Sequence, residues 1–195
     1  MGRKVQRVPY TLDPGDIKDL PFDEIKVILR GADDLIMTGG RTLLSKILKG
    51  SREKRVMELG LNHSPVYGHY QDLSLEELKS RIGWVILHGY LDIKYDYRLP
   101  MLIYTMWGWE IERETYADEL LEGFDQLLED RENNLDMTYL KDRDRGMILM
   151  LLDKVEATKD EKYIPVLEAW EKVDYKKVQK RIRQVIHSIR GEKVP

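Results

Sequence analysis

The sequence predicts a mainly α protein in two parts: a helical domain that carries a β-hairpin, followed by an all-helical tail. Through most of the 195 residues, apolar side chains recur every three or four positions, which is typical of amphipathic helices. Two runs, at residues 90–95 and 101–105, instead favour strands around a short polar turn and predict a hairpin. Beyond residues 132–134 only the helical period continues.

The first elements are an arm and two helices. Residues 1–20 are expected to form an arm, because they are basic at first and are then interrupted by prolines and a glycine. The next apolar stripe predicts a helix over 21–38, which a pair of glycines ends. A short second helix runs up to Gly50, and residues 51–59 are compatible with one or two further helical turns.

The strongest local signal marks a helix over 74–88. Ser74 and Glu77 form the S-x-x-E pattern of a capping box, directly before an apolar stripe. The hairpin follows with Asp96-Tyr97-Arg98 as its turn, and residues 114–130 supply a closing helix. Three helices, a hairpin and a closing helix stand in the order of a winged helix. The first part is therefore predicted to be an α+β winged helix with the hairpin as its wing.

These elements divide the chain into four segments. We assign residues 1–20 to the basic arm, 21–112 to the winged-helix domain, 113–134 to a linking helix and 135–195 to an all-α, repeat-like tail. Helices of the tail are expected at about 142–155, 161–172 and 174–190.

Composition restricts the class of protein. Hydrophobic residues make up 42% and charged residues 34% of the chain, as in an ordinary globular protein. The absence of cysteine excludes disulfides, thiolate nucleophiles and cysteine-bound zinc, and it favours a reducing compartment. No apolar run approaches the roughly 20 residues that span a bilayer, and no signal peptide is recognisable. The expectation is a cytoplasmic protein without a membrane segment, nucleoid-associated if bacterial.

Charge is unevenly distributed along the chain, although the net charge is only −3. Residues 1–60 carry 12 basic against 9 acidic side chains, and residues 136–195 carry 14 against 11. The middle, residues 61–135, carries 6 against 15. A polyanion responds to a local patch rather than to the total, so a basic face for nucleic acid stays open. The acidic middle is also compatible with a protein partner.

Ordered motifs resemble one family over residues 22–112. The run Leu48-Lys49-Gly50-Ser51 is followed by Arg55, by Tyr67-Gly68, by Gln71-Asp72, by the helix 74–88 and by Gly89-Tyr90-Leu91. Thr105 and Gly108 form a T-x-x-G at the end of the wing. This order and spacing resemble the RQC domain, the winged-helix domain that follows the helicase core of RecQ-family enzymes. The resemblance implies a winged-helix fold and DNA binding. Residues 151–170, LLDKVEATKDEKYIPVLEAW, more weakly resemble a HEAT-like helical repeat.

The chain departs from RecQ helicases in two ways. It has no G-x-x-x-x-G-K-[ST] loop to hold a nucleotide, and it lacks the cysteines of the zinc subdomain. Its four histidines have no metal-ligand spacing, and no nucleophile motif is present. The prediction is a free-standing, non-enzymatic RQC-like module without cofactor or metal.

Candidate DNA-binding residues surround Ser51 and the wing tip. By the resemblance, Lys49, Ser51 and Arg55 match positions that contact phosphates. A helix N-terminus after Ser51 would present N–H groups to a phosphate, although a solvated polar turn is the alternative. Tyr97 at the wing tip could stack on an opened base pair, or be an ordinary exposed tyrosine. The predicted DNA-binding residues are Lys49, Ser51, Arg52, Lys54, Arg55, Gln71, Lys79, Tyr97 and Arg98.

Two further basic surfaces are candidates. Helix 74–88 would enter the major groove in a standard winged helix, but Glu76 and Glu77 at its start oppose phosphate. Its Trp84 is expected in the core or against a partner. In the tail, the lysines and arginines of 176–183 fit either a phosphate track or a solvated repeat face.

The predicted function is non-catalytic binding of duplex or forked DNA in replication, recombination or repair. The predicted partner is DNA, with a protein partner of the C-terminal helices as a second candidate. Two alternatives stay open: a protein-interaction adaptor built on the winged helix and the repeat, and a transcription regulator, which would need a symmetric dimer.

Overall fold

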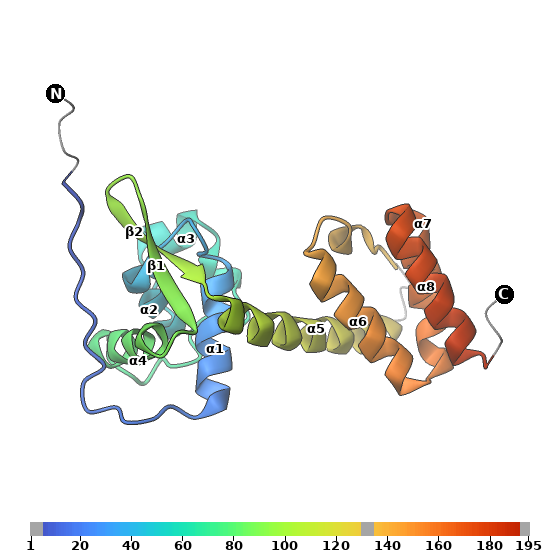
Figure 1. Cartoon of the computed structure of the whole chain (residues 1–195), viewed down its shortest axis with the longest axis horizontal. Coiled ribbons are helices and arrows are strands. Elements are labelled where there is room, and N and C mark those ends of the chain that lie inside the picture. The colour runs from blue at the N-terminus through green and yellow to red at the C-terminus, as the bar shows by residue number, and fades with distance from the viewer. Residues whose placement is uncertain (1–5, 130–134, 192–195) are drawn as a thin grey trace. The chain divides into compact units, whose positions relative to one another are not determined.

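A computed structural model of the chain describes residues 6–129 and 135–191 (Figure 1). Contacts divide the chain into two compact units, Met1–Glu112 and Arg113–Pro195, and the helix α5 (Met106–Glu129) contributes to both. The described residues are mainly helical with one hairpin, so the predicted fold class is confirmed. Among them, no helix has the length and hydropathy needed to cross a membrane.

Four helices form the body of the first unit. They are α1 (Phe22–Asp33), α2 (Arg41–Lys49), the short α3 (Lys54–Glu58) and α4 (Leu75–Leu87), and a 3-10 turn, η1 (Leu61–His63), follows α3. Their apolar stripes meet in a single core, in which α2 packs against both α1 and α4. The predicted capping box of α4 is present: the Ser74 hydroxyl accepts from the Glu77 amide, and the Glu77 carboxylate accepts from the Ser74 amide.

The wing is an antiparallel hairpin. Strand β1 (Leu91–Asp96) pairs with β2 (Leu99–Tyr104) in a register that sets Leu91 opposite Tyr104 and Asp96 opposite Leu99. The backbone before α2 holds β2 from its other side. The Leu102 amide donates to the Gly39 carbonyl and the Met37 amide donates to the Leu102 carbonyl, both at 2.9 Å. This pairing explains why α1 ends at Asp33 rather than at 38, because Met37 and Gly39 bond to Leu102 of the wing instead.

Thr105 and Gly108 close the base of the wing. The Thr105 hydroxyl donates to the Gly89 carbonyl (2.7 Å) and accepts from the Gly108 amide (3.0 Å), which starts α5 immediately after β2. A methyl group added to Gly108 would lie 1.9 Å from the Tyr90 carbonyl oxygen, so only glycine fits there. The closing helix therefore begins at Met106, eight residues before the predicted start at 114.

The N-terminal arm lies along the wing in Figure 1. The Val8 amide donates to the Arg98 carbonyl at 2.9 Å, and the Tyr95 hydroxyl donates to the Val8 carbonyl at 2.7 Å. The arm is therefore part of the first unit from residue 6 onward, whereas the basic residues Arg3 and Lys4 lie outside the described residues.

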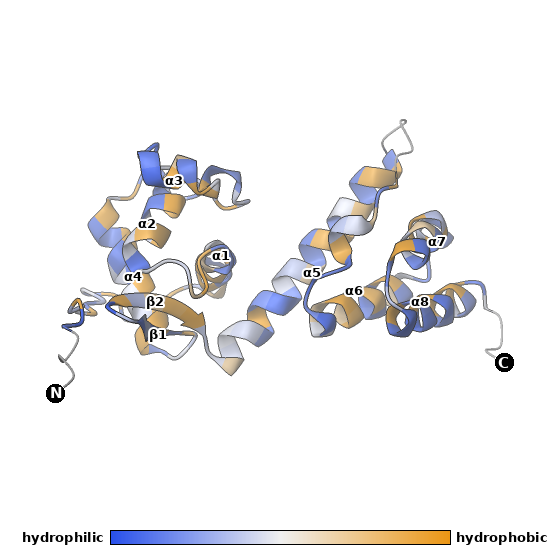
Figure 2. Ribbon diagram, turned by 90° about the horizontal axis from the view of Figure 1, so that it is seen from above, coloured by the Kyte–Doolittle hydropathy of each residue, from blue (hydrophilic) through white to orange (hydrophobic). Residues whose placement is uncertain are grey.

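The second unit is all-helical. It contains the rest of α5, η2 (Thr138–Leu140), α6 (Arg145–Thr158), η3 (Glu161–Tyr163), α7 (Ile164–Val173) and α8 (Lys176–Ile189). Apolar and polar residues alternate along α6 and α8 (Figure 2), and their apolar sides join a second core around Phe124 and Trp170. The Trp170 indole donates to Asp174 at 2.7 Å, which fixes the turn between α7 and α8.

Candidate nucleic-acid interface

The turn at Gly50 packs against a second turn that is distant in sequence. Gly50 and Gly68 both have left-handed backbones, with φ of 74° and 72°, and a Cβ on Gly50 would lie 3.0 Å from the Gly68 Cα. The Tyr67 hydroxyl donates to the Ser51 carbonyl at 3.0 Å, and the Lys49 ammonium donates to the Gln71 carbonyl. We call these residues the glycine turn. Three of the motifs that carry the family resemblance thus meet in space to fix the fold locally.

The glycine turn changes the expected roles of its polar residues. The Ser51 hydroxyl accepts from the Glu53 amide at 3.3 Å, and Glu53, not Ser51, is the N-cap of α3. The helix N-terminus expected directly after Ser51 therefore starts three residues later, in a helix of only five residues. The Lys49 ammonium is hydrogen-bonded to the Gln71 backbone, although the side chains of both residues reach the surface.

A cleft of about 470 Å³ opens in the first unit beside the wing. We call it the wing cleft. Its walls are the arm, the N-terminus of α2, Arg55 of α3 and the two strands. The residues that line it are Val8, Pro9, Tyr10, Thr11, Thr38, Gly39, Gly40, Arg41, Thr42, Leu43, Lys46, Arg55, Ile93, Leu99, Pro100 and Met101.

The wing cleft is positively charged. Arg41, Lys46 and Arg55 contribute three cations, and no carboxylate lines the cleft. The N-cap of α2 is Gly40, which has no side chain to accept from the first amides of the helix. These amides and the positive end of the helix dipole add to the field of the three cations. A phosphate group has the charge and the acceptor oxygens that such a site favours.

Arg55 differs from Lys46 and Lys54 in having no acidic partner within the described residues. Lys46 forms an ion pair with Glu53 at 2.6 Å, and Lys54 forms one with Glu58 at 3.5 Å. No ion pair engages Arg55 or Arg52 within the described part of the chain. Of these two arginines, only Arg55 lines the wing cleft.

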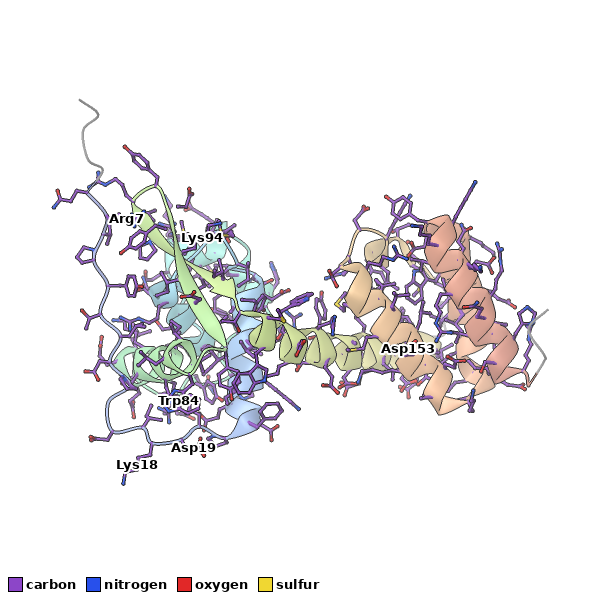
Figure 3. All side chains as sticks on the ribbon, viewed as in Figure 1. Arg7, Lys18, Asp19, Trp84, Lys94 and Asp153 are labelled. Carbon is purple, nitrogen blue, oxygen red and sulfur yellow. The ribbon has the colours of Figure 1, made fainter. Side chains whose placement is uncertain are left out.

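Helix α4 does not offer a basic face. Lys79 pairs with Glu76 at 2.7 Å, and Arg81 pairs with Glu24 at 3.1 Å. Trp84 (labelled in Figure 3) is only 4% exposed. It stacks on His88, with 3.6 Å between the ring centroids. The arm covers part of the helix, since Gly15 lies against Ser80 and the Asp13 carbonyl lies against Gly83.

Two shifted pKa values near α4 have local causes. The hydrogen bonds of the capping box, from the Ser74 amide first, hold the pKa of Glu77 below its usual value. Burial raises the pKa of Tyr70 to about 12, with Glu24 adding to the shift. At neutral pH Glu77 is therefore ionised and Tyr70 is neutral.

The wing tip exposes an aromatic ring on a strained backbone. Tyr97 is 73% exposed and has a φ of +49°, a conformation that glycine or asparagine adopts more easily. The neighbouring Arg98 is held by the arm, because its Nε donates to the Gln6 carbonyl at 3.0 Å. Arg7 lies over the Tyr95 ring beside the hairpin, 4.7 Å from the centroid (Figure 3). At this exposure the Tyr97 ring does not belong to the core of the first unit.

The predicted residues thus fall into separate places. Arg55 lines the wing cleft; Lys49, Ser51 and Gln71 belong to the glycine turn; Arg52 and Lys54 lie exposed beside it; Tyr97 and Arg98 form the wing tip; and Lys79 lies on α4. Sequence reasoning missed Arg41 and Lys46. The available signal was the glycine pair directly before Arg41, which leaves the N-terminus of α2 without a side-chain cap.

The chain was compared with known protein families, curated proteins and solved structures. The model of the RQC domain family matches residues 22–116. Neither the curated proteins nor the solved structures contain a significant match to the chain. Within the described residues, no group of histidine, aspartate and glutamate side chains could hold a metal ion.

Proposed function

Residues 22–116 belong to the RQC domain family, the winged-helix, generally DNA-binding domain of RecQ helicases, and on that premise we propose how this protein binds DNA. It acts as a non-catalytic DNA-binding protein that holds the backbone of duplex or forked DNA in the wing cleft. Its setting is replication, recombination or repair.

The charge of the wing cleft is the observation that supports this proposal most strongly. Three cations and a helix N-terminus surround the cleft and no acid lines it; within the described residues, only Lys46 of the three has an acidic partner, Glu53. The other expected surface, α4, has its cations paired and is partly covered by the arm. Backbone phosphates are therefore contacted from the wing side, and α4 does not read bases in the major groove.

Tyr97 adds a role at strand ends. A backbone held in an unfavourable conformation to present an exposed aromatic ring favours a functional reason for the residue. Base–aromatic stacking stabilises a complex by about 1–3 kcal/mol per base. The ring can make this contact where a base pair has opened, so forked DNA gains more from it than intact duplex.

Binding of labelled duplex DNA across a salt series tests the proposal. Arg55→Ala removes one phosphate contact, so the slope of log K against log salt should fall by roughly 0.9. Lys54→Ala is the matched control, because it removes the same charge from the same short helix but outside the wing cleft. An equal loss in both variants contradicts the assignment of the cleft. A wild-type protein that shows no binding at low salt favours the protein adaptor instead.

A further inference from the structure

The second unit contains a pocket that the proposed function does not use. It has a volume of about 610 Å³ and lies where the chain enters α6 and α8. We call it the tail pocket. Its charged lining consists of five cations and two acids, which are Lys141, Arg143, Arg145, Lys176 and Lys177 with Asp142 and Asp174.

Both acids of the tail pocket already accept hydrogen bonds from the fold. Asp174 accepts from the Trp170 indole at 2.7 Å and from the Tyr175 amide at 2.6 Å. Asp142 accepts from the Tyr175 hydroxyl at 3.1 Å. No salt bridge within residues 6–129 and 135–191 joins either acid to a cation of the pocket. The lining therefore keeps an excess of positive charge.

Lys176 and Lys177 stand where positive charge is unfavourable. They occupy the first turn of α8, where the helix dipole is itself positive and where acids are usually found. The N-cap, Tyr175, forms no side-chain cap, so it leaves the first amides of α8 to other acceptors. Lys176, Lys177 and the start of α8 thus line one end of the pocket. A bound anion would relieve the repulsion.

The arginines of α8 and of its C-cap lack this freedom. Arg181 pairs with Asp153 at 2.7 Å, Arg183 pairs with Glu171 at 2.6 Å, and Arg190 pairs with Glu168 at 3.0 Å. In contrast, no ion pair engages Lys176, Lys177 or Arg145 within the described residues. The basic stretch along 176–183 is therefore not a uniform phosphate track. Its arginines hold the helices together, and its first two lysines face the pocket.

We propose that the tail pocket is a second phosphate-binding site, which takes backbone phosphates of the nucleic acid that the first unit holds. The identity of the ligand rests on the proposed function. Tyr175 favours a nucleic acid over an acidic peptide, because its ring is 58% exposed at the pocket and Lys141 lies over it at 5.2 Å. An exposed aromatic ring beside phosphate-binding cations offers a stacking surface for a base.

The test compares two double variants of the full chain on DNA long enough to reach both units. Lys176→Gln/Lys177→Gln removes the two lysines of the tail pocket. Lys159→Gln/Lys162→Gln removes the same charge beyond the opposite end of α6, outside the pocket. Each lost phosphate contact should lower the salt slope by roughly 0.9, which is about an eightfold loss of affinity at 0.1 M salt. The control should keep the wild-type slope.

The outcomes separate the two proposals. If Arg55→Ala weakens binding while Lys176→Gln/Lys177→Gln matches its control, the tail pocket is refuted and the proposed function stands. If the wild type fails to bind DNA, the proposed function is refuted. An NMR titration with inorganic phosphate then tests whether the tail pocket binds phosphate at all. Shifts of the Lys176 and Lys177 amides then support a phosphate site, and their absence overturns it. Stronger shifts with poly-glutamate than with an oligonucleotide overturn the choice of ligand.

Discussion

Replacing Gly108 by alanine tests how the wing is fixed to α5. Alanine is the better helix former, by about 1 kcal/mol in a helix interior, so propensity alone predicts a more stable protein. The contact with the wing predicts the opposite. The new methyl group would lie 1.9 Å from the Tyr90 carbonyl oxygen, and real Cβ atoms essentially never approach closer than 3.0 Å. The start of α5 must therefore move away from Tyr90 by about 1.1 Å, the difference between these two distances.

The cost of that movement outweighs the gain in propensity. Overpacking of this kind costs about 1–3 kcal/mol, and the upper end applies because the opposing atom is backbone and cannot rotate away. The shift also strains the hydrogen bond from the Gly108 amide to Thr105, which contributes about 1 kcal/mol. After the propensity gain, the first unit should lose about 2–3 kcal/mol of unfolding free energy.

Gly123→Ala is the matched control for this measurement. Gly123 lies in the same helix, and a methyl group there meets no atom within 4 Å. It should stabilise the second unit by up to about 1 kcal/mol. Urea unfolding measures both variants, followed by circular dichroism and by tryptophan fluorescence. The fluorescence reports mainly on the first unit, because three of the four tryptophans lie there. A Gly108→Ala protein as stable as the wild type would refute the packing of α5 on Tyr90.

Three further predictions concern α4 and the wing tip. Ser74→Ala should destabilise the first unit by about 1 kcal/mol through loss of the cap. The pKa of Glu77 is lowered in the folded state, so its carboxylate adds to the free energy of unfolding at neutral pH. This contribution is lost as pH falls below the usual pKa of 4.5. The stability difference between wild type and Glu77→Gln should therefore vanish in acid. Tyr97→Gly should relieve the backbone at the wing tip without loss of stability, yet weaken forked DNA more than duplex in a binding assay; equal effects on both would exclude the stacking role.

Local signals in the sequence were sufficient for several elements. The capping box placed α4 correctly because both of its hydrogen bonds lie within four residues of chain. The glycine pair before residue 41 and Gly50, with its left-handed backbone, set the ends of α2. The order of the motifs identified the RQC domain, which the family match confirms over residues 22–116.

Elements that depend on distant contacts were predicted less well. The apolar period continues to Ile36, but α1 stops at Asp33 because residues 37–39 pair with Leu102 across the fold. The start of α5 was missed because Thr105 bonds back to Gly89, a contact that local periodicity does not show.

The wing cleft could not be predicted from the sequence for the same reason. Its walls come from the arm, from α2 and α3 and from the hairpin, which are far apart along the chain. Arg55 was found through the family resemblance. Arg41 and Lys46 join it only once the arm is seen to lie against the wing.

NMR mapping of the first unit with a short duplex tests the central claim most directly. We expect the largest shifts at the amides of Gly40, Arg41 and Arg55, which surround the wing cleft, and small shifts at Glu76 and Lys79 on α4. The shifts should weaken as salt is raised, because phosphate contacts release counterions. Largest shifts along α4, with the wing cleft unaffected, would contradict the account.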